Sequence, residues 1–348
     1  MDETLMTFEE KCTYRLRSLY RKYGYLPYKM GKFEEYELYI RNKDFLVSDQ
    51  VIAFGDTNGK MMALKPDVTL SIIKNGEDTP GVKQKVFYGE NVYRVSESTR
   101  RFKEIMQLGL ECIGDIDAYD IFETVSLAAE SLSRISDDFR IEISNLDLIR
   151  SVITSVCDDP EFMAKTIRCI SEKNRHDLKT ICGEYGIPAE KQESIDALIT
   201  VYGERKSVIR ALEERFDLPQ VREMALISEL LEQSPFSDKI RYDFSIVNDL
   251  KYYNGFVFKG YADGACDSIL SGGQYDNMMR RMNRRSGAIG FAIYFDRMEE
   301  RNHEGGKTDV DYLLLYDEST DVKTIARKVA SLVGDGFSVS TQKSIPEK

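Results

Sequence analysis

The residues best suited to do chemistry lie on one strand-like stretch, residues 104–113. Apolar side chains alternate there with polar ones, and successive side chains of a strand point to opposite faces. The apolar set is Met106, Leu108, Leu110 and Cys112. The other set is Gln107, Gly109 and Glu111, an amide and a carboxylate that flank a glycine. Glycine inside a strand often marks the close approach of a ligand or of another backbone. The stretch therefore predicts a strand with one core-covering face and one face equipped for binding.

The neighbouring segments predict that this strand belongs to a long antiparallel hairpin. Residues 85–95 have the character of a partner strand and carry Arg94. The connecting loop, 96–103, is polar and contains Arg100, Arg101 and Lys103. An ordinary surface hairpin with one solvated face is the alternative, since half-exposed antiparallel sheets are common.

Three other places carry candidate site residues. Asp67 and Thr69 follow Pro66 at a predicted helix start, where side chains of these types cap backbone N–H groups. Tyr252 and Tyr253 are adjacent, so on a strand one can enter a pocket while the other packs. The stretch 286–298 is a glycine-containing strand that leads into a helix bearing Arg297. A glycine-rich turn into a helix can bind phosphate, but two glycines are a weak signal for it.

Composition limits the possible functions. The chain has 348 residues, 42% hydrophobic and 31% charged, as in an ordinary globular protein. Its net charge of -11 argues against a sequence-independent nucleic-acid binder. Six cysteines without CxxC spacing and two histidines do not suggest a metal site, and no cofactor is expected. The cysteines are expected to be reduced core residues of a cytoplasmic protein, and no apolar run is long enough to span a membrane.

The elements that position these residues follow from sequence periodicity. Helices are expected at 8–23, 33–42, 117–135 and 146–156, with a hairpin over 51–64 and strands at 139–144, 240–246, 255–261 and 267–273. Residues 157–237 show helical patterns and no strand pattern. We therefore expect a core formed by 1–156 and 238–302, an all-helical insertion at 157–237, and a short C-terminal α/β segment at 308–348.

Taken together, the motifs resemble class II aminoacyl-tRNA synthetases in their histidyl form. YGENVYR followed by QLGLECIG resembles motif 2, LKPDVT resembles the RPE/DxT element, YYNGFVF and SGGQYD resemble the two histidine-site elements, and GAIGFAIYFDRM resembles motif 3. Their order matches along residues 1–300. The resemblance implies an α+β fold with an antiparallel sheet flanked by helices, a helical insertion, and a homodimer formed through motif 1.

Two branches of this superfamily fit the resemblance. One is histidyl-tRNA synthetase, an enzyme. The other comprises the synthetase-like regulatory subunits of ATP phosphoribosyltransferase, which activate a short catalytic subunit in the first step of histidine biosynthesis. Asn248 stands where the synthetase pattern has a catalytic arginine, Lys251 replaces an aspartate, and Gln274 replaces the arginine of GGRYD. A neutral, short side chain cannot offset charge developing on a phosphate.

These departures favour the regulatory branch, with no catalytic residues of its own. So does the C-terminal part, because the ~39 residues beyond Asp309 fall below the usual domain size of about 50 or more and are too few for the anticodon-binding domain of a synthetase, unless the chain is truncated. The expected partners are the catalytic subunit, a second copy of the chain, and histidine as a ligand, whereas tRNA is not expected. A synthetase, or a free-standing amino-acid sensor, remains the alternative.

The resemblance also assigns site residues. The positions that match histidine contacts in the family are Asp67, Thr69, Gln107, Glu111, Tyr252 and Tyr253. Carboxylates suit an α-ammonium or a protonated imidazole through charge-assisted hydrogen bonds. Arg94 and Arg297 match the arginines that hold nucleotide phosphates in the synthetases. Salt bridges within an inherited, idle site are the alternative for these two arginines.

Overall fold

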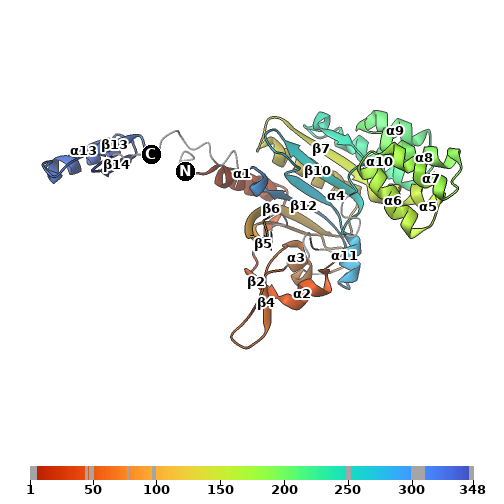
Figure 1. The fold of residues 1–348 in the computed structure, drawn as a ribbon, viewed down its shortest axis with the longest axis horizontal. Helices are drawn as coiled ribbons and strands as arrows, with labels where there is room; N and C mark the ends of the chain where they lie inside the picture. The colour runs from red at the N-terminus through yellow and green to blue at the C-terminus, as the bar shows by residue number, and fades with distance from the viewer. Residues whose placement is uncertain are drawn as a thin grey trace. The chain divides into compact units, whose positions relative to one another are not determined.

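The computed structural model describes residues 6–43, 46, 51–76, 78–95, 99–247, 252–298 and 310–344. The chain divides into two compact units, Met1–Glu299 and Glu300–Lys348, which are described separately. The first unit contains a large sheet with helices on its faces (Figure 1). All candidate site residues except Asn248 and Lys251, which lie outside the described residues, belong to this part of the structure.

A nine-stranded sheet forms the centre of the first unit, in the order β1-β5-β6-β12-β11-β10-β7-β9-β8. The strands in that order are β1 (Leu26–Pro27), β5 (Gln84–Val95), β6 (Phe102–Gly114), β12 (Gly287–Tyr294), β11 (Leu270–Gln274), β10 (Asn254–Ala262), β7 (Phe139–Asn145), β9 (Ile240–Tyr242) and β8 (Gly203–Glu204). Neighbours pair antiparallel except β1 with β5 and β7 with β9. The sheet is therefore mixed at its margins, where the sequence predicted an antiparallel one.

Strands β5 and β6 form the predicted long hairpin. Their register runs from Gln84 opposite Ile113 to Val95 opposite Phe102. Leu108, Leu110 and Cys112 are buried in the main core, as their alternation predicted. Burying each leucine side chain contributes about 1.5–3 kcal/mol, which fixes the face that the strand turns inward.

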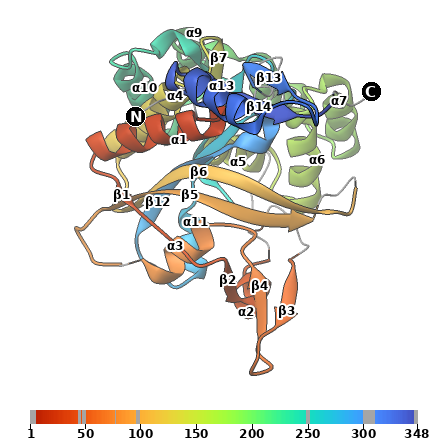
Figure 2. The ribbon, with the colours of Figure 1, turned by 90° about the vertical axis from the view of Figure 1, so that its left-hand side faces the viewer.

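Helices cover the core face of the sheet: α1 (Phe8–Lys22), α4 (Ala118–Ser133) and α5 (Leu146–Val156). Capping boxes begin α1 at Thr7 and α4 at Asp117, so both start where the sequence predicted. Helix α4 packs on β10 and β12, and α1 packs on β5 and α4. In Figure 2, α1 and α4 lie on one side of the β5–β6 hairpin, and α3 (Thr69–Asn75) lies on the other.

A smaller sheet and two helices accompany the opposite, site-bearing face. The small sheet has the order β2-β4-β3, with bounds Phe33–Glu35, Met61–Leu64 and Ala53–Gly55. The helix predicted over 33–42 is only partly correct, because residues 33–35 form β2 and the helix α2 spans Tyr36–Arg41. Pairing of Phe33 with Leu64 explains the difference, since such a tertiary pairing is invisible in local periodicity.

Residues 157–237 are mainly helical and gather at the β7 end of the sheet (Figure 1). Their helices are α6 (Pro160–Ser171), α7 (Arg175–Glu184), α8 (Ala189–Thr200), α9 (Arg205–Glu213) and α10 (Pro219–Leu231). The prediction of no strand here is wrong at Gly203–Glu204, which pairs with β9. Two residues are too few to produce an alternating pattern. The limits of an insertion domain remain a prediction.

Two of the later strands, β9 and β11, are shorter than the sequence suggested, whereas β10 extends slightly beyond its predicted bounds. The strand predicted over 240–246 ends at Tyr242, because Asp243–Val247 turns back on itself through a hydrogen bond from Ile246 N–H to the Asp243 carbonyl. Helix α11 (Asp276–Arg281) follows β11. The stretch after β12 is a short 3₁₀ helix, Phe295–Met298, so Gly287 and Gly290 lie within a strand and form no phosphate-binding turn.

The second unit is a single βαβ arrangement. Its strands β13 (Tyr312–Leu315) and β14 (Val339–Gln342) pair in parallel, and α13 (Val322–Gly334) connects them. These elements match the predicted C-terminal segment. The part of the chain from 299 to 309, which includes the predicted linker, lies outside the described residues.

The cysteines lie only in part where the sequence predicted them. All six cysteines lie among the described residues, none of them forms a disulfide bond there, and four of them are buried. Cys266 is exposed and Cys157 half-buried, so the prediction of core positions is wrong for Cys266. It follows β10 in a turn that the apolar pattern did not reveal.

Among the helices of the described ranges, none combines the length and the apolar character needed to cross a membrane.

Candidate functional site

The polar face of β6 is covered by protein. Gln107 and Glu111 are each 2% exposed, so the interpretation of a solvated hairpin face is wrong. A buried amide and a buried carboxylate require partners, because an unpaired polar group loses its hydration without compensation. The face is therefore a built polar site enclosed within apolar surroundings.

Glu111 is the best-connected residue of this site. Its carboxylate accepts hydrogen bonds from the Thr69 hydroxyl, 2.8 Å from Oε1, and from the Tyr275 hydroxyl, 2.6 Å from Oε2. Gly290 stands beside Glu111 on β12, and a Cβ at that position would lie 1.8 Å from Oε2. Only glycine there leaves room for the carboxylate, which is a function of Gly290 that the sequence analysis did not find.

Asp67 and Thr69 approach Glu111 from the start of α3, and only one of them caps the helix. Asp67 Oδ1 accepts a hydrogen bond from the Leu70 N–H at 2.9 Å, as its capping interpretation predicted. The Thr69 hydroxyl bonds Glu111 instead, so capping is the wrong interpretation for Thr69. Asp67 is 8% and Thr69 5% exposed. Helix α3 thereby brings a second carboxylate close to Glu111.

Burial makes both carboxylates hard to ionise. Burial, together with the neighbouring Asp67, raises the pKa of Glu111 to about 8, although the hydrogen bonds from Tyr275 and Thr69 act in the opposite direction. Burial also raises the pKa of Asp67, against the N–H of Leu70 and the charge of Arg94. A bound cation would stabilise the ionised forms of both groups. The electrostatics of the site therefore favour a ligand with a positively charged group.

Three tyrosines form an aromatic wall beside these acids. The rings of Tyr252 and Tyr253 lie 4.4 Å apart, and the rings of Tyr252 and Tyr275 lie 6.0 Å apart. Tyr252 reaches Thr69 with its phenol, and Tyr253 packs over Gly273, where a Cβ would be 3.0 Å from the ring. The structure thus brings both predicted tyrosines to the site and adds Tyr275, which the sequence analysis missed although it lies in SGGQYD.

Gly109 accommodates a side chain of the protein itself. Tyr88 pairs with Gly109 across the hairpin, and a Cβ on Gly109 would lie 2.5 Å from the Tyr88 hydroxyl. The expectation that this glycine marks close approach was correct, but the approaching groups are the Tyr88 ring and the Phe291 carbonyl. Tyr88 was absent from the predicted site. The hairpin register could have identified it as the partner of the glycine.

The two candidate phosphate arginines lie near one tyrosine ring on β12. The guanidinium groups of Arg94 and Arg297 are 5.9 and 4.8 Å from the ring centre of Tyr294. Arg94 is buried and donates from Nε to the Pro66 carbonyl at 3.1 Å. Arg297 is half-buried and donates to Ser268. Both arginines therefore have structural partners, and Arg94 also holds the segment that carries Asp67.

Gln274, one of the departures from the synthetase pattern, has a defined structural role. Its Oε1 accepts a hydrogen bond from the Phe256 N–H at 2.8 Å, at an irregularity in the pairing of β10 with β11. Gly255 faces the same amide with a φ of +56°, and a Cβ there would lie 2.2 Å from Oε1. Arginine has no acceptor atom and could not make this hydrogen bond.

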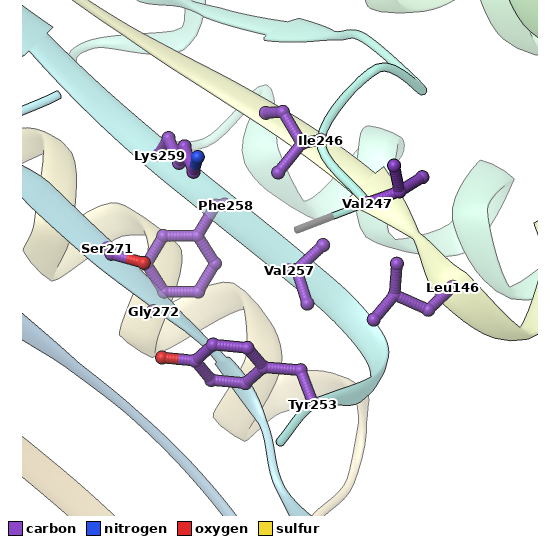
Figure 3. Close-up of a pocket in the computed structure, with 9 residues that line it drawn as sticks. All are labelled: Leu146, Ile246, Val247, Tyr253, Val257, Phe258, Lys259, Ser271 and Gly272. Carbon is purple, nitrogen blue, oxygen red and sulfur yellow. The ribbon is translucent and has the colours of Figure 1, made fainter. Parts of the chain in front are cut away.

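A small apolar hollow of about 10 Å³ is lined in part by Tyr253 of the aromatic wall (Figure 3). Val257, Ile246, Val247 and Leu146 point into it, and Lys259 and Ser271 provide its polar groups. It shares Tyr253 with the carboxylate site and does not include Glu111 or Asp67. Among the described residues, no cluster of histidine, cysteine, aspartate or glutamate has the composition of a metal site.

The fold and the buried site together define a class II aminoacyl-tRNA synthetase-like domain. A family model for histidyl-tRNA synthetase matches residues 2–298. The chain belongs to the histidyl-tRNA synthetase family. The predicted fold class is therefore confirmed.

Relatives with two different functions resemble the chain. It is 28% identical over 289 residues to the histidine–tRNA ligase of Methanocaldococcus jannaschii, covering 82% of this chain and 69% of that protein. It is 26% identical over 347 residues to the ATP phosphoribosyltransferase regulatory subunit of Thermoanaerobacter sp. (strain X514), covering 94% and 88% of the two chains.

Solved structures confirm the fold along most of the chain. An ATP phosphoribosyltransferase regulatory subunit/histidyl-tRNA synthetase from Bacillus halodurans matches with a TM-score of 0.77 at 21% identity, covering 98% of this chain and 90% of that one. The HisG:HisZ complex of ATP phosphoribosyltransferase from Thermotoga maritima contains a chain that matches with a TM-score of 0.65 at 19% identity, covering 83% and 97%.

Proposed function

We propose that this chain is a non-catalytic regulatory subunit of ATP phosphoribosyltransferase that activates a short catalytic subunit. The match to a regulatory subunit over 94% of the chain, including its C-terminal part, supports this assignment. The match to the histidine–tRNA ligase covers a smaller share of both proteins. The Thermotoga neighbour is a complex of two different subunits, which supports a catalytic subunit as the partner here.

The proposal is carried by the combination of a buried polar cluster around Glu111 with altered synthetase positions. Glu111, Asp67 and Thr69 remain buried together. Gln274 is bonded to the backbone in place of the arginine of the synthetase pattern. Asn248, at the position of the catalytic arginine by resemblance, offers no positive charge to a transition state. The site is therefore suited to binding an amino acid without activating it.

Histidine is the ligand that we propose for this pocket. Its α-ammonium suits Asp67 and Glu111 through charge-assisted hydrogen bonds. Its ring can pack against the tyrosine wall, and Gln107 supplies a buried amide. Histidine, the product of the pathway, would then act as a feedback ligand on ATP phosphoribosyltransferase, the enzyme of the first step. We further propose a homodimer in the cytoplasm, without tRNA as a partner.

A histidyl-tRNA synthetase is the second candidate function. Arg94 and Arg297, which match the phosphate-binding arginines, are both present and lie near Tyr294. They would be retained in a working enzyme. The identity of 28% to a histidine–tRNA ligase also supports this alternative.

Histidine-dependent ATP–pyrophosphate exchange separates the two functions. The purified chain should show no exchange above background, because the altered positions remove the groups that stabilise adenylate formation. A histidyl-tRNA synthetase measured in parallel provides the positive control. Exchange at a rate comparable to that enzyme would exclude the regulatory assignment. Complex formation with the catalytic subunit, followed by light scattering, tests the partner independently.

A further inference from the structure

Four arginines stand close together at the end of α11, outside the pocket around Glu111. They are Arg280, Arg281, Arg284 and Arg285, which we call the arginine turn. Three of them are exposed, and Arg284 is half-buried. The chain as a whole is acidic, with 59 aspartates and glutamates against 48 lysines and arginines. The arginine turn is therefore a local basic patch on an acidic protein.

Stabilisation of the preceding helix accounts for only part of this patch. Basic residues in the last turn of a helix interact favourably with the helix dipole, and Arg280 and Arg281 occupy such positions. Helix α11 ends at Arg281, so Arg284 and Arg285 lie beyond its last turn. Two of the four charges thus have no function in the dipole of the helix.

The exposed side chains of the arginine turn are poorly neutralised. Other exposed arginines pair with an acid a few positions away, as Arg168 does with Glu172. The acid at the same spacing from Arg280 is Asp276, but its carboxylate accepts hydrogen bonds from a side-chain amide on β10 and a backbone N–H on β12. Among the residues that the structure describes, neither Arg280 nor Arg285 has an ion pair. Both guanidinium groups are therefore available to a partner.

Contacts with the end of α3 and the segment after it hold the backbone of the arginine turn in place. Asp78 accepts hydrogen bonds from the N–H groups of Arg285 at 2.8 Å and Ser286 at 3.0 Å. The Arg284 guanidinium donates to the Lys74 carbonyl at 2.9 Å, and α3 and α11 accordingly lie side by side in Figure 2. A surface that is fixed before binding loses less conformational entropy when a partner docks.

We propose that the arginine turn is a docking surface for a carboxylate-rich patch of the catalytic subunit. Guanidinium groups bind carboxylates through paired, charge-assisted hydrogen bonds, and arginine is enriched in protein interfaces. A protein partner fits better than a nucleic acid, because a net charge of -11 repels a long polyanion, whereas a local patch acts on the surface that contacts it. This inference rests on the proposed function, which supplies the partner, and adds the surface at which that partner binds.

Reversing the charge of two exposed arginines tests this surface. The double variant Arg280→Glu with Arg285→Glu keeps the hydrogen bonds to Asp78, because these come from backbone groups and from Ser286. An exposed ion pair corresponds to roughly a 2- to 5-fold change in affinity, and charge reversal adds repulsion. The variant should therefore bind the catalytic subunit roughly 10-fold or more weakly in calorimetric titration.

The matched control is Lys191→Glu with Arg210→Glu, which makes the same change in net charge at exposed positions of the helical insertion. This control should bind the catalytic subunit as the wild type does. The salt dependence of binding gives a readout that a purely structural role would not change. The affinity of the wild type should fall as the salt concentration rises, because salt screens exposed charge pairs, and the affinity of the reversed variant should not.

The outcomes separate the docking surface from the proposed function. With all variants verified as folded by melting curves, equal affinity of the reversed variant and the wild type would overturn the role of the arginine turn. Equal weakening in the control pair would also overturn it, because net charge alone would then explain the effect. Binding of RNA that is lost in the reversed variant, with unchanged binding of the catalytic subunit, would overturn it in favour of a nucleic acid. Failure of the wild type to bind the catalytic subunit would contradict the proposed function itself.

Discussion

Replacing Glu111 should weaken histidine binding, and the variant that removes more of the carboxylate's interactions should lose more affinity. Glu111 is 2% exposed and carries the hydrogen bonds from Thr69 and Tyr275. A carboxylate offers about four lone-pair directions in total, so these two hydrogen bonds leave acceptor capacity for a ligand. Glu111→Ala removes the charge and both acceptor oxygens, whereas Glu111→Gln removes the charge and replaces one acceptor oxygen by an NH2 donor.

The magnitude follows from the cost of a charged hydrogen bond in a buried site. Such a bond contributes roughly 1.5–3 kcal/mol, so Glu111→Ala should lose about one to two decades in affinity. A neutral hydrogen bond contributes about 0.5–1.5 kcal/mol, so Glu111→Gln should fall between the wild type and Glu111→Ala. The expected order of affinity is therefore wild type, then the glutamine variant, then the alanine variant.

Isothermal titration of histidine into each protein measures this order directly. Glu104→Gln, an exposed position on the same strand, is the matched control and should bind like the wild type. A melting curve of each empty variant verifies that it is folded. If Glu111→Ala and Glu111→Gln bound histidine as tightly as the wild type, Glu111 would not contact the ligand and the reasoning about the pocket would be refuted.

Three further expectations concern stability and assembly. Because burial raises the pKa of Glu111 from 4.5 to about 8, the folded empty protein binds an additional proton, so stability that is present at low pH is lost as the pH rises through about 8. The melting temperature should therefore fall from pH 5 to pH 9, and a pH profile as steep in Glu111→Gln as in the wild type would contradict this. Gln274→Arg should destabilise the fold by about 1–3 kcal/mol in urea unfolding through loss of the acceptor for the Phe256 N–H, and Gln274→Glu, which keeps an acceptor, should lose less; equal losses would exclude that cause. Light scattering at micromolar concentration should give twice the chain mass of 40.0 kDa, and a strict monomer would rule out the proposed dimer.

Local patterns predicted much of the fold because they depend on near neighbours in sequence. The alternation of Leu108, Leu110 and Cys112 identified a buried strand face, and the residues around Asp117 identified a helix start. Both features arise from side chains a few positions apart. The helix predicted over 33–35 was wrong because distant pairing with β4 outweighed the local preference.

The candidate site was also predicted only in part, because some of its contacts join residues that are far apart in the sequence. Motif resemblance led to Asp67, Thr69, Glu111 and the tyrosine pair, which the structure brings into one region. It could not show that Thr69 bonds Glu111 across 42 residues, or that the glycines at 109 and 290 make room for Tyr88 and Glu111. Those facts depend on sheet register, which one sequence specifies only through the packing of the whole domain.

The central claim, that this chain regulates ATP phosphoribosyltransferase, is tested most directly by the turnover of the catalytic subunit. The short catalytic subunit encoded in the same genome should be assayed alone and with increasing amounts of this chain, at fixed ATP and phosphoribosyl pyrophosphate. The proposed function predicts that turnover rises with the concentration of the chain and saturates at a defined ratio. Turnover that stayed unchanged at all ratios, with histidine-dependent pyrophosphate exchange by the chain alone, would contradict it.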